Sequence, residues 1–398
     1  MTRRDRRPFH ATETPRARRI REAIEREEAL RARGIDPLKP RRGAKRARPR
    51  PGRWKRNVVL VLLVVLLSGC TGGWLLWQRV AAFNDAVSSA GSVSSALLFP
   101  LMGSDRVNVV MYGYGGPEHK GGTFLADSII ILSIDPKTDT TTLIPIPRDL
   151  WVQGLPEIPD NAKINEAFAD GFVRGGVAEA GRAATAVLAK VTGLPLEHWL
   201  AIDFTGFKAM VDTVGGVDVV NPVAFGYTWS EPRFHAGVWD GGYFRAGPIY
   251  LNGTRALDYS RTRYTSVPGE SSDFARSVRQ QRVLVALRGK LGGGGIGALG
   301  PGLAIMDALK GDGQVPLMGT DLSAIDLYLL SSHLGADRRI ELSEGKVLEA
   351  TTNSIGQYIL VVIGRSSGSD YAPLQAFLRT ELARPLPTLT PSPSPSRP

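Results

Sequence analysis

The longest feature of the hydrophobic pattern is an unbroken apolar run near the N-terminus. Residues 57–78 carry VVLVLLVVLL at their centre, and the next charged side chain is Arg79. About 20 consecutive apolar residues are enough for a helix to cross the hydrocarbon core of a bilayer. Trp54 lies before the run and Trp74 and Trp77 lie at its end, as in the aromatic belts of membrane helices. The pattern therefore predicts one transmembrane helix over residues 57–78.

Beyond this run, short apolar stretches alternate with helical patterns. The stretches at 106–112, 128–133 and 140–147 are almost continuously apolar, which is typical of strands in a sheet that is covered on both faces. Apolar residues three and four apart predict helices at other places. The further expected elements are helices at 178–192, 204–214, 321–334 and 371–382 and strands at 198–203, 217–220 and 358–363. This alternation predicts an α/β domain with helices on both sides of the sheet.

One long segment, residues 221–248, has no clear periodicity. It is rich in aromatic residues, namely Phe225, Tyr227, Trp229, Phe234, Trp239, Tyr243 and Phe244. A long aromatic loop beside a substrate site often acts as a lid or stacks on sugars. The alternative is a loop packed on itself, with the aromatic side chains as local core.

These elements divide the chain into six parts. They are a basic and mostly disordered arm at 1–56 with a short charged helix near 16–33, the membrane helix at 57–78, a small-residue stalk at 79–104, a central domain at 105–291, residues 292–384 as its C-terminal part or a small subdomain, and a Pro/Ser/Thr tail at 385–398. The arm and the tail have too few apolar residues to pack a core.

The charge is concentrated in the arm. The whole chain has a formal net charge of +11, but residues 1–56 hold 21 Lys/Arg and 7 Asp/Glu, and the rest holds 28 and 31. A nucleic-acid-binding surface across the fold is therefore not expected. Because positive segments stay on the cytoplasmic side, we expect a cytoplasmic N-terminus and an extracytoplasmic domain. The arm either only sets this topology or also contacts anionic lipids or a cytoplasmic partner.

Cys70 is the only cysteine, which excludes a disulfide framework and a cysteine metal cluster. The sequence LSGC that ends at Cys70 resembles a lipoprotein cleavage box, so a lipidated N-terminus at this residue is one interpretation. The apolar run continues through WLLW at 74–77, however, which favours a retained anchor helix.

Five arginines gather within residues 257–282: Arg261, Arg263, Arg276, Arg279 and Arg282. An extended backbone at 259–263 would point the first two the same way. A helix is expected to begin at Asp273 and to run to a break near Gly293, with Ser272 or Asp273 itself as its cap. This helix would place Arg276, Arg279 and Gln280 on one face, because they lie three and four residues apart. Clustered guanidinium groups repel one another unless an anion lies between them, and their planar fork suits phosphate oxygens. This pattern predicts a phosphate-rich ligand.

Two further polar signals lie at strand ends. Asp127 closes the glycine-rich segment 113–127 at the start of a buried strand, so it is either a metal-binding or basic carboxylate or a turn-forming residue. Arg148 and Asp149 follow the strand at 140–147, at a position where the loops of α/β sheets usually build sites. They could equally form a structural ion pair.

Several motifs follow one another between residues 108 and 291. They include LADSIIILSIDPKT, LIPIPRDLWV, LAIDFTGFKAMVDTVGGVDV, LNGTRALDYSRTR and SDFARSVRQQR. In kind, order and separation these motifs resemble the LytR–CpsA–Psr (LCP) family. The resemblance implies an α/β/α sandwich with a mixed central sheet. It also implies a membrane-anchored phosphotransferase that moves a glycopolymer from a polyprenyl-pyrophosphate carrier to a peptidoglycan acceptor.

The resemblance also implies roles for individual residues. Asp127 would hold Mg²⁺ (or Mn²⁺) and act in catalysis with Arg148 and Arg263. The implied pyrophosphate ligands are Arg148, Arg261, Arg263, Arg276, Arg279 and Gln280. Arg282 has no counterpart in the motif.

The chain departs from the family pattern at two positions. Gly115 stands where many relatives have a second metal-binding carboxylate, and Leu125 stands where they have arginine. Glu118 or His119 is the candidate for the missing ligand, although a lone loop histidine is more often merely solvated.

Phosphoryl transfer depends mainly on positioning and on neutralising charge, which arginines and Mg²⁺ supply. The lipid tail needs an apolar slot, and the helix faces at 204–214 and 283–291 are equal candidates. Two other functions remain open: hydrolysis of the polyprenyl pyrophosphate, and non-catalytic binding of the lipid-linked glycan by an envelope regulator. DNA binding is least favoured, since Phe9 and Trp54 are the only aromatic residues of the arm.

Overall fold

The computed structural model describes residues 14–34, 53–88, 96–103, 105–117, 119, 124–158, 161–229, 240–291, 299–311, 317–334 and 337–385. The chain divides into two units, Met1–Gly72 and Gly73–Pro398. In the first unit the helix α1 (Pro15–Ala32) is exposed along its whole length, which agrees with the charged helix expected near 16–33. The disorder expected for the rest of the arm and for the tail concerns residues outside those described.

The expected membrane helix is longer than predicted. Helix α2 runs from Arg53 to Val87 and contains the one described helical segment, Asn57–Val87, that is long and apolar enough to cross a membrane. Its apolar side chains between Val58 and Leu67 are 40–63% exposed, whereas a core helix would bury them. The end of α2 differs, because Phe83 and Val87 are buried in a core cluster. Part of the segment expected as a stalk therefore belongs to the packed fold.

The second unit is built on a mixed six-stranded sheet with the order β12-β6-β1-β2-β3-β13. Strands β1 and β6 pair in parallel, as do β3 and β13, and the other neighbours are antiparallel. The strands are β1 (Val107–Tyr114), β2 (Ala126–Asp135), β3 (Thr140–Pro145), β6 (His198–Asp203), β12 (Met318–Thr320) and β13 (Arg338–Arg339). The four inner strands lie where the sequence predicts them. The two short edge strands carry no apolar run and were not predicted.

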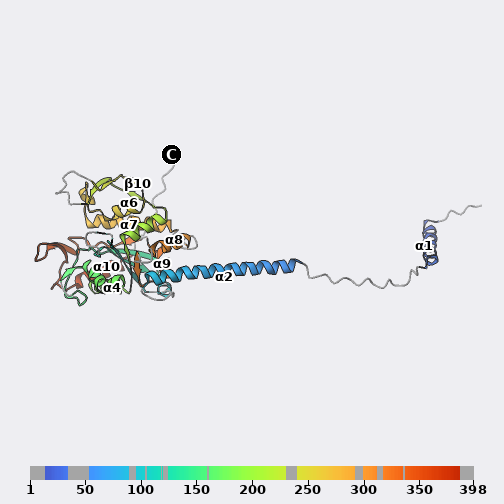
Figure 1. Ribbon diagram of the computed structural model, residues 1–398, viewed down its shortest axis with the longest axis horizontal. Helices are drawn as coiled ribbons and strands as arrows, with labels where there is room; N and C mark the ends of the chain where they lie inside the picture. The colour runs from blue at the N-terminus through green and yellow to red at the C-terminus, as the bar shows by residue number, and fades with distance from the viewer. Residues whose placement is uncertain are drawn as a thin grey trace, which may run out of the picture. The chain divides into compact units, whose positions relative to one another are not determined.

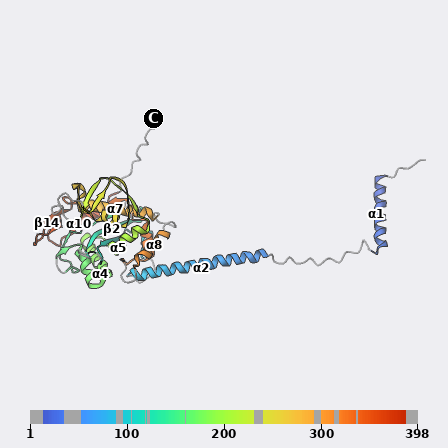
Figure 2. The same cartoon turned by 45° about the horizontal axis from the view of Figure 1, so that its top comes forward.

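Helices cover both faces of this sheet, as expected (Figures 1 and 2). Val187 and Leu374 pack with Ile131 on one face, and Leu330 packs with Val109 and the rest of a second cluster on the other. The α/β/α sandwich is thus confirmed. The helices of the unit beyond α2 are α3 (Leu98–Met102), α4 (Glu166–Thr192), α5 (Phe204–Thr213), α6 (Gly253–Arg261), α7 (Asp273–Lys290), α8 (Leu299–Leu309), α9 (Ala324–Ser331) and α10 (Ala372–Ala383).

The described part of the aromatic segment packs on itself only in part, because Trp229 and Tyr243 are exposed. Phe225, Tyr227 and Phe244 are buried and stack on one another beside Tyr259 of α6. Phe234 and Trp239 lie outside the described residues. Strands β8 (Phe225–Thr228) and β9 (Gly242–Phe244) carry these rings and form a small sheet with β11 (Tyr264–Thr265), which contacts the 3₁₀ turn η1 (Pro268–Glu270). A second small sheet consists of β7 (Val217–Asn221) and β10 (Gly247–Leu251). The remaining short strands pair as β4 (Trp151–Val152) with β5 (Ala162–Lys163) and as β14 (Leu348–Thr352) with β15 (Tyr358–Val362).

The expectation of an extended backbone at 259–263 is wrong. Helix α6 runs to Arg261, because the side chain of Asn252 caps its first turn by accepting a hydrogen bond from the Arg255 N–H at 3.0 Å. Ala256 and Tyr259, three residues apart, bury one face of the helix. Arg261 therefore ends a helix and Arg263 begins the next extended segment.

Candidate active site

A cavity of about 590 Å³ lies between the central sheet and the helices α2, α5, α7, α8 and α9. Its lining is apolar except for one polar part. The residues of that part include Asp127, Ser128, Arg148, Asp203, Arg261, Arg263, Arg276 and Gln280. The cavity thus brings together Asp127 and five of the six predicted pyrophosphate ligands, which come from four separate segments of the chain.

Asp127 and Arg148 meet because β2 and β3 are antiparallel neighbours, so the start of one strand lies beside the end of the other. Arg148 donates a hydrogen bond from Nη1 to Asp127 Oδ1. Its Nε lies 3.6 Å from Asp149 Oδ2, and Lys163 Nζ lies 2.5 Å from Asp149 Oδ1. Arg148 is therefore both a member of a structural ion-pair network and a residue of the cavity wall.

This network keeps Arg148 charged. Burial lowers the pKa of its guanidinium, but the negative charges of Asp127, Asp149 and Asp273 outweigh burial and raise the pKa above the ordinary value. A permanent cation at this position suits an anionic ligand.

Arg263 and Arg276 share one carboxylate. Arg263 Nε lies 3.1 Å and Arg276 Nη2 lies 3.2 Å from Asp273 Oδ1. The N-cap of α7 is Ser272, whose side chain accepts a hydrogen bond from the Ala275 N–H, so Asp273 is left to pair with the arginines. Two guanidinium groups on a single carboxylate leave an excess of positive charge.

Arg276 is a buried cation. It is 6% exposed, and desolvation lowers the pKa of its guanidinium to about 10, against the opposing effect of Asp273. The Nε atom of Arg276 is buried without a hydrogen bond among the described residues, whereas that of Arg148 faces Asp149. A buried donor without an acceptor is costly, so Arg276 suits an oxygen-rich anion in this part of the cavity.

Arg261 is held by aromatic rings. Its guanidinium carbon lies 4.1 Å from the ring centre of Phe204 and 5.8 Å from that of Trp229. Within the described part of the chain it forms no ion pair or hydrogen bond. Burial lowers the pKa of Arg261, although Asp127 and Asp258 oppose that effect. Its hydrogen-bond donors are therefore left for a ligand.

Arg279 is not brought to the cavity, which corrects the expectation that it binds the pyrophosphate. It is fully buried, and its guanidinium donates to the carbonyl oxygens of Tyr259, Thr262 and Glu270 and to the Glu270 carboxylate at 2.6 Å. All of these acceptors belong to the segment 259–270. Arg279 thus holds the segment that carries Arg261 and Arg263.

Gln280 does line the cavity. Its Nε2 donates to the carbonyl oxygen of Ser260 at 3.2 Å, and its Oε1 accepts from Ser128 Oγ at 3.1 Å. Gln280 thereby ties α7 to both α6 and β2. Arg282, which has no counterpart in the family motif, donates from Nη1 to the Tyr259 hydroxyl at 3.0 Å.

Sequence reasoning missed Asp203, which ends β6 opposite Tyr114 in register. Its Oδ1 accepts from the Gly206 N–H at 2.6 Å and so caps α5, and the residue also lines the cavity. Gly116, with a φ of +78°, lets the backbone approach, because a Cβ there would come 2.8 Å from Asp203 Oδ2. The strand-to-helix boundary at DFTG was the available signal. Trp229 gave none, since nothing in its surroundings separated it from the other aromatic residues.

The carboxylates fit a metal ion only in part. The described residues include no group of three or more His, Cys, Asp or Glu side chains that could hold one. His119 is absent from the described cavity wall, and its ring packs edge-on against Phe204 at 5.3 Å between centres. Glu118 lies outside the described residues. Asp127 is a carboxylate surrounded by arginines. A single carboxylate of this kind fits a Mg²⁺ ion, which takes most of its ligands from phosphate oxygens and water.

The apolar part of the cavity unites the two candidate slots. Phe207 and Met210 of α5 and Leu284 and Leu287 of α7 all line it. The sequence offered these faces as alternatives, and the fold uses both. Helix α8 and the end of α2 add further wall that was not expected.

Comparison with known proteins agrees with this picture. A family model described as the LytR_cpsA_psr family matches residues 79–347. TagU of Oceanobacillus iheyensis is 30% identical over 317 residues, which cover 77% of this chain and 88% of TagU. TagV of Bacillus subtilis is 30% identical over 237 residues, which cover 58% of this chain and 56% of TagV, so the match spans little more than half of that relative. Both are named polyisoprenyl-teichoic acid–peptidoglycan teichoic acid transferases.

Solved structures show the same fold. The crystal structure of B. subtilis TagV has a TM-score of 0.51 at 22% identity and covers 71% of this chain and 98% of its own. Protein gbs0355 from Streptococcus agalactiae has a TM-score of 0.52 at 23% identity, covering 74% and 93%.

Proposed function

This chain belongs to the LytR–CpsA–Psr family, and from that premise we propose that it is a membrane-anchored phosphotransferase that moves a glycopolymer from a polyprenyl-pyrophosphate carrier to a peptidoglycan acceptor. The observation that carries the proposal is the division of the cavity into a cationic part and an apolar part. A lipid pyrophosphate has the same division, with a highly charged head on a hydrocarbon tail. The names of the relatives support a polyisoprenyl-linked donor and a peptidoglycan acceptor.

In this proposal the arginines bind and orient the pyrophosphate. Arg148, Arg263 and Arg276 contact its non-bridging oxygens, and Arg261, which lies against the ring of Phe204 in the same polar part of the cavity, completes the set. Fixed cations in a site shielded from water stabilise the charge that develops during phosphoryl transfer, without reorganising at the moment of reaction. Arg279 acts only as a positioning residue.

The acceptor sugar hydroxyl forms a new bond to the phosphorus that carries the glycan, and the bond from that phosphorus to the polyprenyl phosphate breaks. The hydroxyl proton passes to Asp127, which lines the same polar part of the cavity. The leaving polyprenyl phosphate is already a stable anion, so it needs no proton donor. Mg²⁺ (or Mn²⁺), held by Asp127 and the phosphate oxygens, would neutralise further charge on the pyrophosphate.

Topology completes the proposal. The exposed apolar stretch of α2 would lie in the cell membrane, with the basic arm in the cytoplasm and the catalytic unit outside. This places the site on the side of the membrane where the acceptor is found.

The experiment is a transfer assay on the full chain in detergent or nanodiscs. Radiolabelled phosphoglycan on a prenyl carrier is mixed with peptidoglycan fragments and a divalent metal, and labelled peptidoglycan is the expected product. Arg263→Ala and Arg276→Ala should each lower the rate about 100-fold or more. Arg288→Ala is the matched control, since Arg288 lies on the same helix as Arg276 but outside the cavity wall.

Other outcomes separate the alternatives. If glycan phosphate is released without an acceptor, the protein is a hydrolase of the lipid pyrophosphate and not a transferase. Tight binding of the lipid with no turnover over a range of metals would favour a non-catalytic binder or envelope regulator. If the transfer rate is unchanged in both Arg263→Ala and Arg276→Ala, the proposed site is wrong.

A further inference from the structure

The end of the anchor helix is fixed to the catalytic unit. Asn84 of α2 accepts a hydrogen bond through Oδ1 from the Ala324 N–H at 2.8 Å, and Ser88 forms a parallel bridge with Thr320 of the edge strand β12. Phe83 is 1% exposed within a core cluster. The last turns of α2 are thus a fixed wall and not a flexible spacer.

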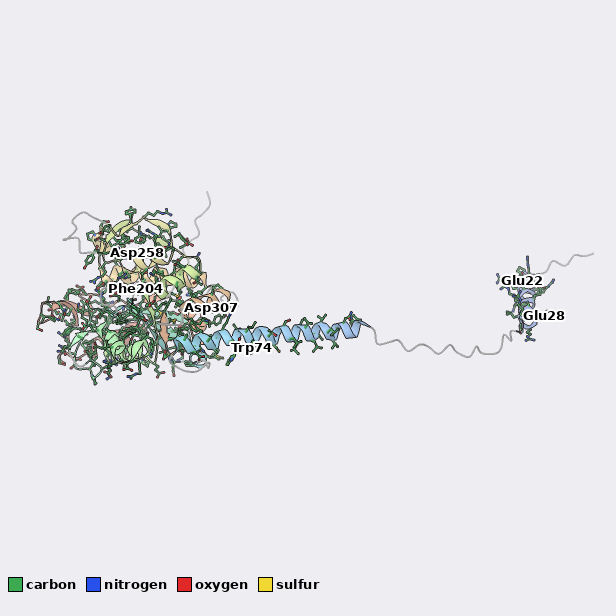
Figure 3. All side chains as sticks on the ribbon, viewed as in Figure 1. Glu22, Glu28, Trp74, Phe204, Asp258 and Asp307 are labelled. Carbon is green, nitrogen blue, oxygen red and sulfur yellow. The ribbon has the colours of Figure 1, made fainter. Side chains whose placement is uncertain are left out.

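This wall faces the cavity. Leu76, Val80 and Phe83 are four and three residues apart, so they share one face of α2, and all three line the cavity. Met306 of α8 lines it from the neighbouring helix. Helices α2 and α8 meet at an ion pair, in which Arg79 Nη1 lies 4.0 Å from Oδ2 of Asp307, a residue labelled in Figure 3.

The three side chains differ in how far they are covered. Leu76 is 41% exposed, Val80 is half-buried and Phe83 is buried. The exposure of the cavity wall therefore decreases along α2, from the surface of the protein to its core. The open end continues into Trp74 and the apolar stretch before it, whose described side chains are exposed. An apolar surface of this length without protein cover fits contact with lipid.

The length of α2 also places its last turns at the membrane surface. Residues 57–77 already suffice for the hydrocarbon core at about 1.5 Å per residue, which leaves the turns around Val80 at the membrane surface. The cavity of about 590 Å³ is of the size that encloses a drug-sized ligand. A short prenyl chain fits within such a volume, whereas the much longer undecaprenyl chain must leave it.

We propose that α2 and α8 form a portal through which the hydrocarbon chain of the carrier lipid passes from the bilayer into the cavity, so that the anchor helix is itself part of the substrate-binding wall. The proposal rests on the proposed function, because it takes the ligand to be a prenyl pyrophosphate. The head and first isoprene units enter the cavity, and the rest of the chain stays in the membrane beside α2. The enzyme thereby binds the head of the lipid without extracting the whole hydrocarbon chain from the membrane.

The test compares two prenyl pyrophosphates on the full chain in lipid nanodiscs. Val80→Trp narrows the portal, and Ala82→Trp, which places the same side chain on the exposed face of α2, is the matched control. Val80→Trp should raise the Kd for undecaprenyl pyrophosphate about tenfold or more and change the Kd for farnesyl pyrophosphate less than about twofold. Met306→Trp should reproduce this pattern from α8, and Ala82→Trp should change neither constant.

Unchanged farnesyl binding shows that the variants are folded. Equal effects on both ligands, or no effect of Val80→Trp and Met306→Trp on either, would overturn the portal. The proposed function fails in a different way: the unaltered chain would bind both lipids yet transfer no glycan, and the comparison of Val80→Trp with Ala82→Trp would still decide the portal.

Discussion

At the level of single residues, Arg261 and Arg279 are both withdrawn from solvent, but their surroundings are opposite. Arg279 donates hydrogen bonds to three carbonyl oxygens and to the Glu270 carboxylate, while Arg261 lies against the rings of Phe204 and Trp229. The first arrangement stabilises the fold, and the second leaves a cation ready for a ligand.

Substituting the two arginines should separate stability from binding. Arg279→Ala leaves the partly buried Glu270 carboxylate and three carbonyl groups without their partner, so the free energy of unfolding should fall by about 3–5 kcal/mol. Arg261→Ala should change it by less than about 1 kcal/mol while weakening prenyl-pyrophosphate binding at least about tenfold. Urea denaturation and a binding titration measure the two quantities. A stable Arg279→Ala protein with lost binding would show that Arg279 is a ligand after all.

Asp273 should make stability depend on acidity. Burial raises the pKa of its carboxyl, but Arg276, Arg263 and Arg148 outweigh burial and hold the pKa below its ordinary value. Its contribution is therefore fully present above the unfolded pKa of about 3.9 and is lost as the pH falls through the lower folded value.

Asp273→Asn should lower stability at about pH 7 by roughly 1–3 kcal/mol and reduce the further loss on going to about pH 3. Denaturant midpoints at the two pH values give the comparison. Asp218→Asn, on a side chain that is 67% exposed, is the control and should change neither midpoint. An unaltered acid dependence in Asp273→Asn would contradict the assignment.

At the level of elements, the close contact of α6 with α5 positions Arg261. The Gly253 N–H donates to Asp212 Oδ1 at 2.7 Å, and a Cβ on Gly253 would come 2.3 Å from the carbonyl oxygen of Lys208. Only glycine lets the first turn of α6 lie this close to α5.

Two glycine-to-alanine changes in helices should have opposite signs. Gly253→Ala should destabilise the protein by about 1–3 kcal/mol through overpacking and weaken pyrophosphate binding by moving α6. Gly289→Ala should stabilise it by about 0.5–1 kcal/mol, because a Cβ there meets nothing within 4 Å and alanine favours the helix. Thermal melts measure both. Equal effects would show that the helix contact does not set the cost.

The elements predicted well from sequence are those with a strong local signal. The inner strands β1, β2, β3 and β6 carry runs of β-branched and aliphatic residues, and α5 and α10 carry clear helical spacing. Helix α6 was missed because its buried face consists of little more than Ala256 and Tyr259, and its cap at Asn252 was overlooked. Strands β12 and β13 have three and two residues, too few for any period to appear.

The sequence predicts which residue types make up the site. It does not predict which of the arginines line the cavity and which stabilise the fold. Spacing placed Arg276, Arg279 and Gln280 within one turn of α7, and only tertiary contacts decide that Arg279 turns into the fold while its neighbours reach the cavity. Asp203 was invisible as a site residue because its strand and helix had to be placed against β1 first. The proposed catalytic and metal-binding roles stay predictions.

At the level of the whole molecule, the end of α2 and the catalytic unit should unfold together. A truncated form beginning at Gly73 keeps Phe83 and Val87 in their cluster, and one beginning at Asp105 loses them. The shorter form should be less stable by about 3 kcal/mol or more, since each buried side chain contributes about 1.5–3 kcal/mol. Tm values of the two forms test this. Equal values would mean that the helix end only rests on the surface.

The order of strands in the central sheet has a consequence for how the chain folds. The four inner strands end at Asp203, but the edges are closed by β12 and β13, which come more than 100 residues later. Until Arg339 has been synthesised, β6 and β3 present open hydrogen-bonding edges, which are templates for aggregation. Contacts this far apart in sequence also slow the search for the native topology. We therefore expect slow, late folding and a need for protection of the half-made sheet during synthesis.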